Sequence, residues 1–385
     1  MNALISPKKL QTVDDTLSAD AAYRLACDGV TMLWGGDFHQ GRQMVQSLAR
    51  RVDKAREKSL EKELAKSAKK KPASSDKLSD KPRKAAPTPR EVFYGHRQAQ
   101  AQRARILGLV VVQLEADYSL NLRRAPDMRE ACTQAWGAAE QGRTVSLREL
   151  MGVVAAYEWR KKGVEIPALS ALGDGRIYPH YGVFSPVRGE YVDLVAQACV
   201  QRRKDAAFDT AFDIGTGTGV LAAVLASRGV AQVTGTDQDP RAIACAQDNM
   251  QRMGLAKQVG IVQSDLFPAG RADVIVCNPP WLPGKPASPL EHAVYDDTSR
   301  MLRGFLNGLA AHLNEGGEGW LIMSDLAEHL GLRGQDELAG LIATAGLTVA
   351  GQLEAQPLHP KAQDASDPLH AARSREVTRL WRLVV

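Results

Sequence analysis

Residues 181–385 alternate short apolar segments with helical stretches, and this alternation constrains the fold more than any other feature of the chain. Helices fit between the first five apolar segments. Strands that alternate with helices predict a mostly parallel, doubly wound α/β sheet. The segments with the length and composition of strands are Thr210–Ile214, 233–236, Val259–Gln263, 274–277, 320–323, 347–353 and Thr378–Val384.

The chain begins with two stretches, residues 1–65 and residues 66–90. Residues 1–65 are expected to be a helical segment, in which Ser18 caps one helix and Asp37 caps a second. The second helix places Met44, Leu48 and Val52 on one face. Residues 66–90 are dominated by Lys, Ala, Ser and Pro and hold a single Leu, so they cannot bury enough apolar surface to order themselves. We therefore expect residues 66–90 to be a disordered basic linker.

Residues 91–180 are expected to form a smaller α+β domain. Its expected helices run over 91–107, between Pro126 and Gly137, and from the capping box at Ser146 to Gly163. Its expected strands are 109–114 and 119–122. Residues 181–385 then form the large domain.

Charge is distributed unevenly along the chain. The net charge is +5, but residues 50–90 hold 15 Lys and Arg against 6 Asp and Glu. The remainder is therefore mildly acidic, which bears on partners and not on fold. The basic segment, with Arg97, Arg103 and Arg105 beyond it, can follow the phosphate backbone of an RNA or ribosomal substrate, although a solubilising linker explains it equally well.

Composition excludes several classes of protein. No apolar run reaches the ~18–20 residues of a membrane span, and the first 15 residues lack the apolar region of a secretory signal. The 5 cysteines form no C-x-x-C pair, which disfavours a zinc ribbon or a disulfide framework. We expect a cytoplasmic location, no membrane partner and no metal.

A glycine-rich turn follows the first strand of the large domain. Glycines let the backbone turn sharply and let a ligand approach it closely. A dinucleotide fingerprint reads G-x-G-x-x-G, whereas here the third glycine comes one residue early and an acidic residue precedes the first. That arrangement favours a ligand with an amino group. The turn consists of Asp213, Ile214, Gly215, Thr216, Gly217, Thr218 and Gly219.

Carboxylates end the next two strands. Asp237 lies 22 residues after Gly215, a spacing at which a carboxylate accepts hydrogen bonds from ribose hydroxyls. Capping of the helix that begins at Pro240 is the alternative role, for which Asp239 competes. Asp265 ends the third strand and is expected to hold an exocyclic amino group of adenine, with an Asx turn as the alternative.

The segment Asn278-Pro279-Pro280-Trp281 follows the apolar strand 274–277. The two prolines fix the backbone and remove two N–H donors, so that carbonyl oxygens and the Asn278 side-chain oxygen are left as acceptors. Acceptors beside an aromatic face suit a planar NH₂ group, on which Trp281 can stack. A simple strand-ending turn is the alternative.

Together these motifs resemble those of a class I S-adenosylmethionine (SAM)-dependent methyltransferase. More narrowly, residues 181–385 resemble the small-domain group with NPPY-type motifs, which includes ribosomal RNA guanine and adenine N-methyltransferases, DNA adenine methyltransferases and release-factor glutamine methyltransferases. Trp281 stands where Tyr or Phe is commoner. The resemblance implies a Rossmann-like seven-stranded class I methyltransferase sheet, preceded by the smaller α+β domain and the helical N-terminal segment.

The resemblance also implies roles for individual residues. Asp213 and the glycine turn (Gly215, Thr216, Gly217, Gly219) would hold the methionyl part of SAM, Asp237 the ribose and Asp265 the adenine. Residues 181–190 resemble the segment that closes over SAM, which adds Phe184 and Arg188 as cofactor contacts. Asn278, Pro279, Pro280 and Trp281 would hold the methyl acceptor. His180 is expected to be a surface or hinge histidine and not a catalytic base.

Three functions remain open from the sequence. The first is methylation of an exocyclic base amine, most simply in RNA. The second is the same chemistry on a protein glutamine. The third is a SAM-binding or dinucleotide-binding regulatory module without turnover, against which the intact Asn-Pro-Pro-Trp segment argues. The sequence does not separate the first two.

Overall fold

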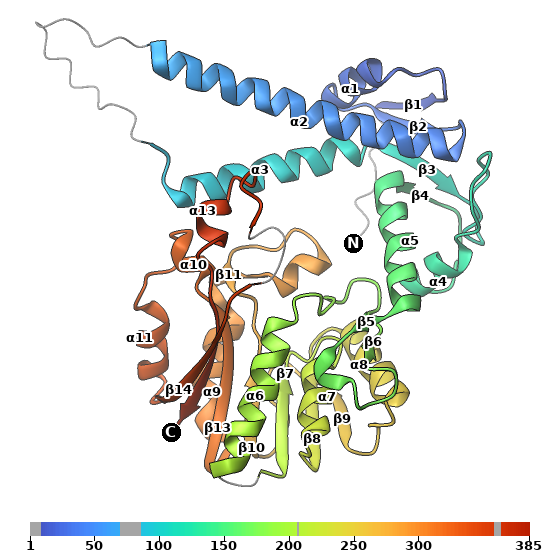
Figure 1. Ribbon diagram of the computed structural model, residues 1–385. Helices are drawn as coiled ribbons and strands as arrows, with labels where there is room; N and C mark the ends of the chain where they lie inside the picture. Colours follow the sequence, from blue (N-terminus) through green and yellow to red (C-terminus); the bar gives the residue numbers. More distant parts are fainter. Residues whose placement is uncertain (1–8, 70–85, 206–207, 358–362) are drawn as a thin grey trace, which may run out of the picture. The chain divides into compact units, whose positions relative to one another are not determined.

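A computed structural model describes residues 9–69, 86–205, 208–357 and 363–385 of the chain (Figure 1). The chain divides into two compact units. Unit 1 comprises Met1–Pro87 and Tyr94–Ala155, and unit 2 comprises Thr88–Phe93 and Ala156–Val385. The division falls within α3 (Pro89–Leu107) and α5 (Leu147–Lys162). No helix in the described ranges is long and apolar enough to cross a bilayer.

Unit 1 is built on a four-stranded sheet with the order β1-β2-β3-β4. The first three strands are parallel, and β4 is antiparallel to β3. Ser18 caps α1 by accepting from the Ala21 N–H over 3.2 Å, and Ser146 caps α5 through the Glu149 N–H over 3.0 Å. Its elements are β1 (Leu10–Val13), α1 (Ala19–Cys27), β2 (Thr31–Trp34), α2 (Phe38–Lys69), β3 (Val110–Leu114), α4 (Arg129–Trp136) and β4 (Arg143–Ser146).

The structure of unit 1 differs from several of the expectations drawn from the sequence. Residues 1–65 are not purely helical, because β1 and β2 lie within them and pair with each other, and β2 also pairs with β3. Residues 119–122 form no strand, only a single bridge between Leu114 and Leu120. Of the expected linker 66–90, residues 70–85 lie outside the described residues, whereas 66–69 end α2 and α3 begins at Pro89. Residues 94–155 of the expected 91–180 domain belong to unit 1 together with the N-terminal segment.

Unit 2 contains a seven-stranded sheet with the order β14-β15-β13-β10-β7-β8-β9. The five strands from β13 to β9 are parallel, and β15 runs antiparallel to both β13 and β14. The Rossmann-like seven-stranded sheet expected of this region is thereby confirmed. Its strands are β7 (Thr210–Ile214), β8 (Gln232–Asp237), β9 (Val259–Gln263), β10 (Ala272–Cys277), β13 (Leu313–Ser324), β14 (Thr348–Ala355) and β15 (Thr378–Val384).

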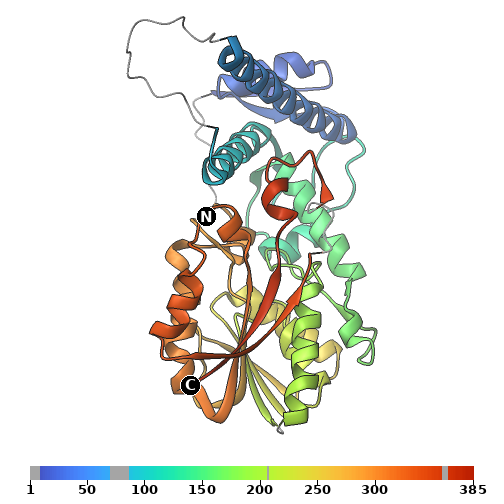
Figure 2. The ribbon, with the colours of Figure 1, turned by 60° about the vertical axis from the view of Figure 1, so that its left-hand side comes forward.

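Helices cover both faces of this sheet (Figure 2). Because side chains alternate along a strand, Val274 and Val276 of β10 pack on the side of α6 and α7, whereas Ile275 and Cys277 pack on the side of α9 and α11. The helices are α6 (Glu190–Asp205), α7 (Val220–Ser227), α8 (Pro240–Arg252), α9 (Arg300–His312), α10 (Leu326–His329), α11 (Glu337–Thr344) and α13 (His370–Arg373).

Two short strand pairs complete unit 2. The pair β5 (Val164–Glu165) and β6 (Arg176–Ile177) is antiparallel, and the pair β11 (Leu282–Pro283) and β12 (Tyr295–Asp296) is parallel. The chain leaves β7 first toward β8 and β9 and later returns to β10 and β13 on the other side. The carboxyl ends of β7 and β10 therefore flank a topological switch point, where open α/β sheets bind ligands.

Candidate functional site

A cavity of about 670 Å³ lies in unit 2 at the carboxyl ends of the parallel strands. It brings together predicted residues from segments that are far apart in the sequence, and of these residues only Gly219 does not line it. The predicted residues that line the cavity are Phe184, Arg188, Asp213, Gly215, Thr216, Gly217, Asp237, Asp265, Asn278, Pro279, Pro280 and Trp281.

The glycine turn joins β7 to α7. Gly215, Gly217 and Gly219 have φ angles of 73°, 54° and 82°, a region that L residues with side chains rarely adopt. A Cβ at Gly219 would lie 2.9 Å from the methyl carbon of Met250 in α8. Gly219 therefore allows α7 and α8 to pack closely, whereas Gly215 and Gly217 face the cavity.

Asp213 is buried at the end of β7, with 1% of its surface exposed. Its Oδ2 accepts hydrogen bonds from the Thr216 hydroxyl (2.6 Å) and from the Ala222 N–H (3.0 Å). Burial raises the pKa of Asp213 to about 6, although these two hydrogen bonds act in the opposite direction. The carboxylate thus shapes the turn and also reaches the cavity.

Asp237 ends β8 and lies beside the glycine turn. Its Oδ1 accepts from the Asp239 N–H (2.9 Å), and its Oδ2 accepts from the Gly217 N–H (3.1 Å). Burial raises its pKa above the ordinary value. The N-cap of α8 is Asp239, which accepts from the Arg241 N–H, so Asp237 is not the cap of that helix.

Asp265 follows β9 and is held by an ion pair that the sequence did not predict. Arg300, at the start of α9, donates to both of its carboxylate oxygens over 3.1 Å. The hydrogen bonds from Arg300 lower the pKa of Asp265. Both side chains are about 60% exposed, so a ligand at this end of the cavity meets the pair and not a free carboxylate.

Asn278 follows β10 at the switch point. Its side-chain Oδ1 accepts a hydrogen bond of 2.9 Å from the indole Nε1 of Trp281. The guanidinium carbon of Arg188 lies 5.0 Å from the centre of the Trp281 ring. One acceptor position of Asn278 and one face of Trp281 are therefore already engaged by the chain itself.

The segment before α6 reaches the cavity through two predicted residues. Phe184 lines it with 38% of its surface exposed. Arg188 donates to Oε1 of Glu190 (2.7 Å) and to Oε1 of Glu376 (3.1 Å). The guanidinium group of Arg188 therefore contacts two buried carboxylates and the ring of Trp281.

Further lining residues were missed by the sequence analysis. No periodicity or motif marks these residues, because they reach the cavity from helix starts and loops. Among them are Tyr191, His292, Arg300, Met301 and Leu326. His180 lies outside this lining, with its Nε2 3.2 Å from Oδ2 of Asp248. The described part of the chain holds no group of three or more His, Cys, Asp or Glu side chains able to bind a metal.

Part of unit 2 is similar to a family of known sequences. The sequence model of the methyltransferase small domain matches residues 174–333, which include the glycine turn and the Asn-Pro-Pro-Trp segment. Every strand from β7 to β13 lies within this match.

Individual relatives match the same region. The release factor glutamine methyltransferase of Cereibacter sphaeroides is 32% identical over 154 residues, which are 36% of this chain and 53% of the relative. That of Rhodopirellula baltica is 29% identical over 230 residues, 54% of this chain and 75% of the relative. The ribosomal protein L11 methyltransferase of Pelotomaculum thermopropionicum is 44% identical over 71 residues, 18% of this chain and 23% of the relative. The chain thus spans about half the length of the first of these relatives.

Among solved structures, the ribosomal protein L11 methylase of Lactobacillus delbrueckii subsp. bulgaricus is similar with a TM-score of 0.36 and 17% identity, over 52% of this chain and 80% of that one. The N-methyltransferase NodS of Bradyrhizobium japonicum, in complex with S-adenosyl-L-homocysteine, has a TM-score of 0.36 and 18% identity, over 50% of this chain and 85% of that one.

Proposed function

We propose that the chain is a SAM-dependent methyltransferase that methylates a planar amide or amino nitrogen, since residues 174–333 match the sequence model of the methyltransferase small domain. The observation that carries the proposal is the position of Asn278 and Trp281 in the same cavity as the glycine turn and Asp237. A methyl donor bound along the turn has its reactive end beside acceptors suited to an NH₂ group.

The residues present fit SAM. Oδ2 of Asp237 accepts from the Gly217 N–H and Oδ1 from the Asp239 N–H, and a carboxylate has about four lone-pair positions, so it can also accept from ribose hydroxyls. Asp213 uses Oδ2 for its hydrogen bonds within the chain, which leaves Oδ1 for the ammonium group. Gly215, Thr216 and Gly217 supply the backbone alongside, and Phe184 covers the cavity.

At the adenine end of the cavity, Asp265 alone does not explain how the base would be bound. Asp265 would hold the adenine amino group only by sharing its oxygens with Arg300, which already donates to both. Arg300 offers a planar guanidinium that can stack on the base instead. We propose that the Asp265–Arg300 pair, and not Asp265 alone, borders the adenine.

The chain contributes to methyl transfer by orienting the nitrogen of the acceptor. When bound, SAM supplies an electrophilic methyl group on a positively charged sulfonium. An amide or aromatic NH₂ is a poor nucleophile because its lone pair is delocalised. Asn278 Oδ1 and the Pro279 carbonyl can accept its two N–H groups, which turns the lone pair toward the methyl group and stabilises the positive charge that develops on nitrogen.

A protein glutamine is the acceptor that we favour. Two of the relatives described above are named as release factor glutamine methyltransferases, and a glutamine side chain ends in a planar amide NH₂. The amide is small enough to enter beside Asn278 while one face of Trp281 remains covered by Arg188. The acceptor would then be a glutamine in an exposed loop of a protein.

An exocyclic base amine in RNA is the second candidate, and it rests on α2. Arg50, Lys54, Lys58 and Lys62 recur every fourth residue and are exposed. At 1.5 Å per residue they form a positive line about 18 Å long. Within the described part of the chain no carboxylate pairs with Lys54, Lys58 or Lys62. Such a line suits a phosphate backbone.

Transfer from tritiated SAM tests both candidates. The purified protein is incubated with extract of a strain that lacks it, and the labelled product is treated with protease or with RNase. We expect protease-sensitive label on a discrete protein, with methylated glutamine after hydrolysis. RNase-sensitive label would select the second candidate, and the absence of label with active protein would contradict the proposed function.

A further inference from the structure

Trp281 is held by contacts on three sides. Its indole Nε1 donates to Oδ1 of Asn278 over 2.9 Å. The Arg188 guanidinium carbon lies 5.0 Å from the centre of its ring, within the range of a cation–π contact. Nη2 of Arg333 donates to its backbone carbonyl over 3.3 Å. The ring, the N–H group and the backbone of Trp281 are each fixed by a different residue.

Arg188 is in turn anchored by carboxylates from two distant segments. Glu190 opens α6 and Glu376 precedes β15, and their side chains are only 5% and 4% exposed. Burial on its own lowers the pKa of Arg188, but these carboxylates outweigh it and raise the pKa above its ordinary value. Arg188 is therefore a permanent cation against the indole ring, where partial desolvation strengthens the cation–π contact.

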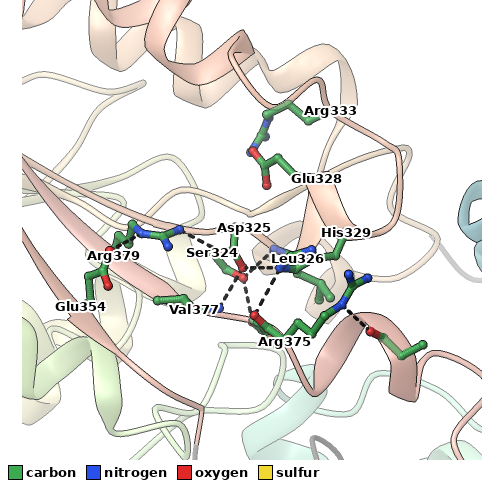
Figure 3. Close-up of polar contacts among 12 residues, drawn as sticks. Ser324, Asp325, Leu326, Glu328, His329, Arg333, Glu354, Arg375, Val377 and Arg379 are labelled. Carbon is green, nitrogen blue, oxygen red and sulfur yellow. Dashed lines mark hydrogen bonds and ion pairs between the residues drawn. The ribbon is translucent and has the colours of Figure 1, made fainter.

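Glu376 is fixed by the end of β13. The Ser324 hydroxyl donates to Oε1 of Glu376 over 2.8 Å. Beside it, Oδ1 of Asp325 accepts from the Val377 N–H over 2.8 Å, and Oδ2 accepts from Arg379 over 2.9 Å (Figure 3). Glu376, which anchors Arg188, is thus itself held by a residue at the end of β13.

Arg333 is buried and has few polar contacts. Its side chain is 2% exposed, and Nη1 lies 3.7 Å from Oε1 of Glu328, beyond hydrogen-bond distance (Figure 3). Nε and Nη1 make no hydrogen bond to any described residue. The bond from Nη2 to the Trp281 carbonyl is therefore a principal polar contact of a costly buried cation.

We propose that Arg188 and Arg333 are positioning residues that hold Trp281 so that its indole N–H keeps Oδ1 of Asn278 directed at the methyl acceptor. This inference rests on the proposed function. An asparagine side chain rotated by 180° would set Nδ2 against the indole N–H, donor against donor, and would offer donors where the acceptor NH₂ needs an oxygen. The indole N–H excludes that rotated state.

The inference depends on tryptophan at this position. Phenylalanine has no N–H group, and the tyrosine hydroxyl lies at the far tip of its ring. Oδ1 of Asn278 has two lone pairs, so the bond from Trp281 leaves one for an N–H of the acceptor. Trp281 therefore acts on the acceptor through Asn278, in addition to any stacking of its ring on the acceptor.

The first test needs no methyl acceptor. In protein labelled with ¹⁵N-tryptophan, the Trp281 indole signal is identified by its loss in Trp281→Phe. We expect Arg188→Met and Asn278→Ala each to move this signal and to speed its exchange with solvent at least several-fold. Arg202→Met is the matched control, because Arg202 contacts Gly316 and Glu318 near the start of β13, away from the cavity, and should leave the signal unchanged. An unchanged signal in Arg188→Met would overturn the inference.

The second test follows transfer of tritium from SAM into the extract described above, at several extract concentrations. We expect Arg188→Met to lower the maximal rate at least ~10-fold, a larger factor than any loss of SAM affinity, and Arg188→Lys to restore part of the rate. If the wild type transfers label and Arg188→Met does so equally fast, the positioning role is wrong and the proposed function stands. If the wild type transfers none, the proposed function fails, and the indole signal alone decides whether Arg188 positions Trp281.

Discussion

The backbone N–H of Gly217 donates to Oδ2 of Asp237 over 3.1 Å, which ties the turn after β7 to the end of β8. Oδ1 of the same carboxylate is held by the Asp239 N–H. The two bonds fix the plane of the carboxylate before any ligand arrives. A ligand that donates two hydroxyl groups therefore finds oriented acceptors and does not have to order them.

Replacement of Asp237 should weaken cofactor binding. Asp237→Ala leaves two ribose hydroxyls unpaired, so we expect calorimetry to show SAM and S-adenosylhomocysteine binding weakened by about 1.5–3 kcal/mol. Asp297→Ala is the control, because Asp297 does not line the cavity and its side chain is half exposed. Unchanged SAM affinity in Asp237→Ala, or binding of NADH in place of SAM, would contradict the assignment.

SAM affinity should depend on pH through Asp213. Burial raises the pKa of this carboxyl to about 6, so the group is mostly ionised at pH 7 and mostly protonated at pH 5. An ammonium ligand binds the ionised form, so affinity should rise with pH up to about pH 7 and then level off. Between pH 7 and pH 5 we expect a loss of about 10-fold.

Asp213→Asn removes the titrating group and is the matched variant for this measurement. It should bind SAM more weakly at pH 7 and show little change between pH 5 and pH 7. A wild-type affinity that is constant over this range, or a pH dependence that survives in Asp213→Asn, would exclude Asp213 as the ammonium partner.

Gly215 should not tolerate a side chain. Its φ of 73° is unfavourable for alanine by about 1–2 kcal/mol, and the new Cβ would lie 2.5 Å from the Met301 methyl carbon. We expect Gly215→Ala to lower both the melting temperature and SAM affinity. Gly340→Ala, in α11 with no atom near the added Cβ, should be neutral or stabilising by up to about 1 kcal/mol. Equal melting temperatures and SAM affinities in the two variants would show that the turn geometry is not required.

The sheet of unit 2 could be predicted because each strand carries its own signal. β7, β9 and β15 have the predicted bounds, since apolar residues flanked by glycine or polar residues define them locally. In the sheet of unit 1, β3 agrees with the strand expected over 109–114, whereas β1 and β2 were not predicted. They have only four residues each and owe their state to pairing, β1 with β2, and β2 with β3, which begins only at Val110. Local propensity decides little in so short a strand.

The site was predictable where backbone geometry demands particular residues. Gly215 and Gly217 of the glycine turn, Asp237 and Asn278 all line the cavity, because their motifs encode strand ends that meet at one edge. The contacts that Arg300, Arg333 and Glu376 make to site residues were not predictable. They depend on side-chain packing between segments up to 188 residues apart, for which the sequence carries no spacing rule.

Charge reversal on α2 tests the RNA candidate. Lys54→Glu, Lys58→Glu and Lys62→Glu together remove the centre of the exposed basic line. In fluorescence anisotropy with a labelled single-stranded RNA, we expect the triple variant to bind at least ~10-fold more weakly. Its binding should also depend less steeply on salt, because about three phosphate contacts are lost.

The control for this variant carries the same change of charge elsewhere. Reversal of the exposed lysines 161, 162 and 257 of unit 2 should leave RNA affinity within about threefold. Equal losses in both triple variants would mean that net charge alone attracts RNA. No loss in either would remove α2 as an RNA-binding surface.

Methyl transfer by Asn278→Ala tests the central claim most directly. The cofactor residues lie on other strands, so the variant should bind SAM nearly as well as wild type by calorimetry. Asn278 Oδ1 is proposed to act on the acceptor more strongly in the transition state than in the ground state, so the loss should appear in kcat more than in KM. We predict transfer from tritiated SAM to fall at least ~10²-fold. Full turnover by Asn278→Ala, with SAM affinity unchanged, would show that the Asn-Pro-Pro-Trp segment is only a turn and would contradict the account.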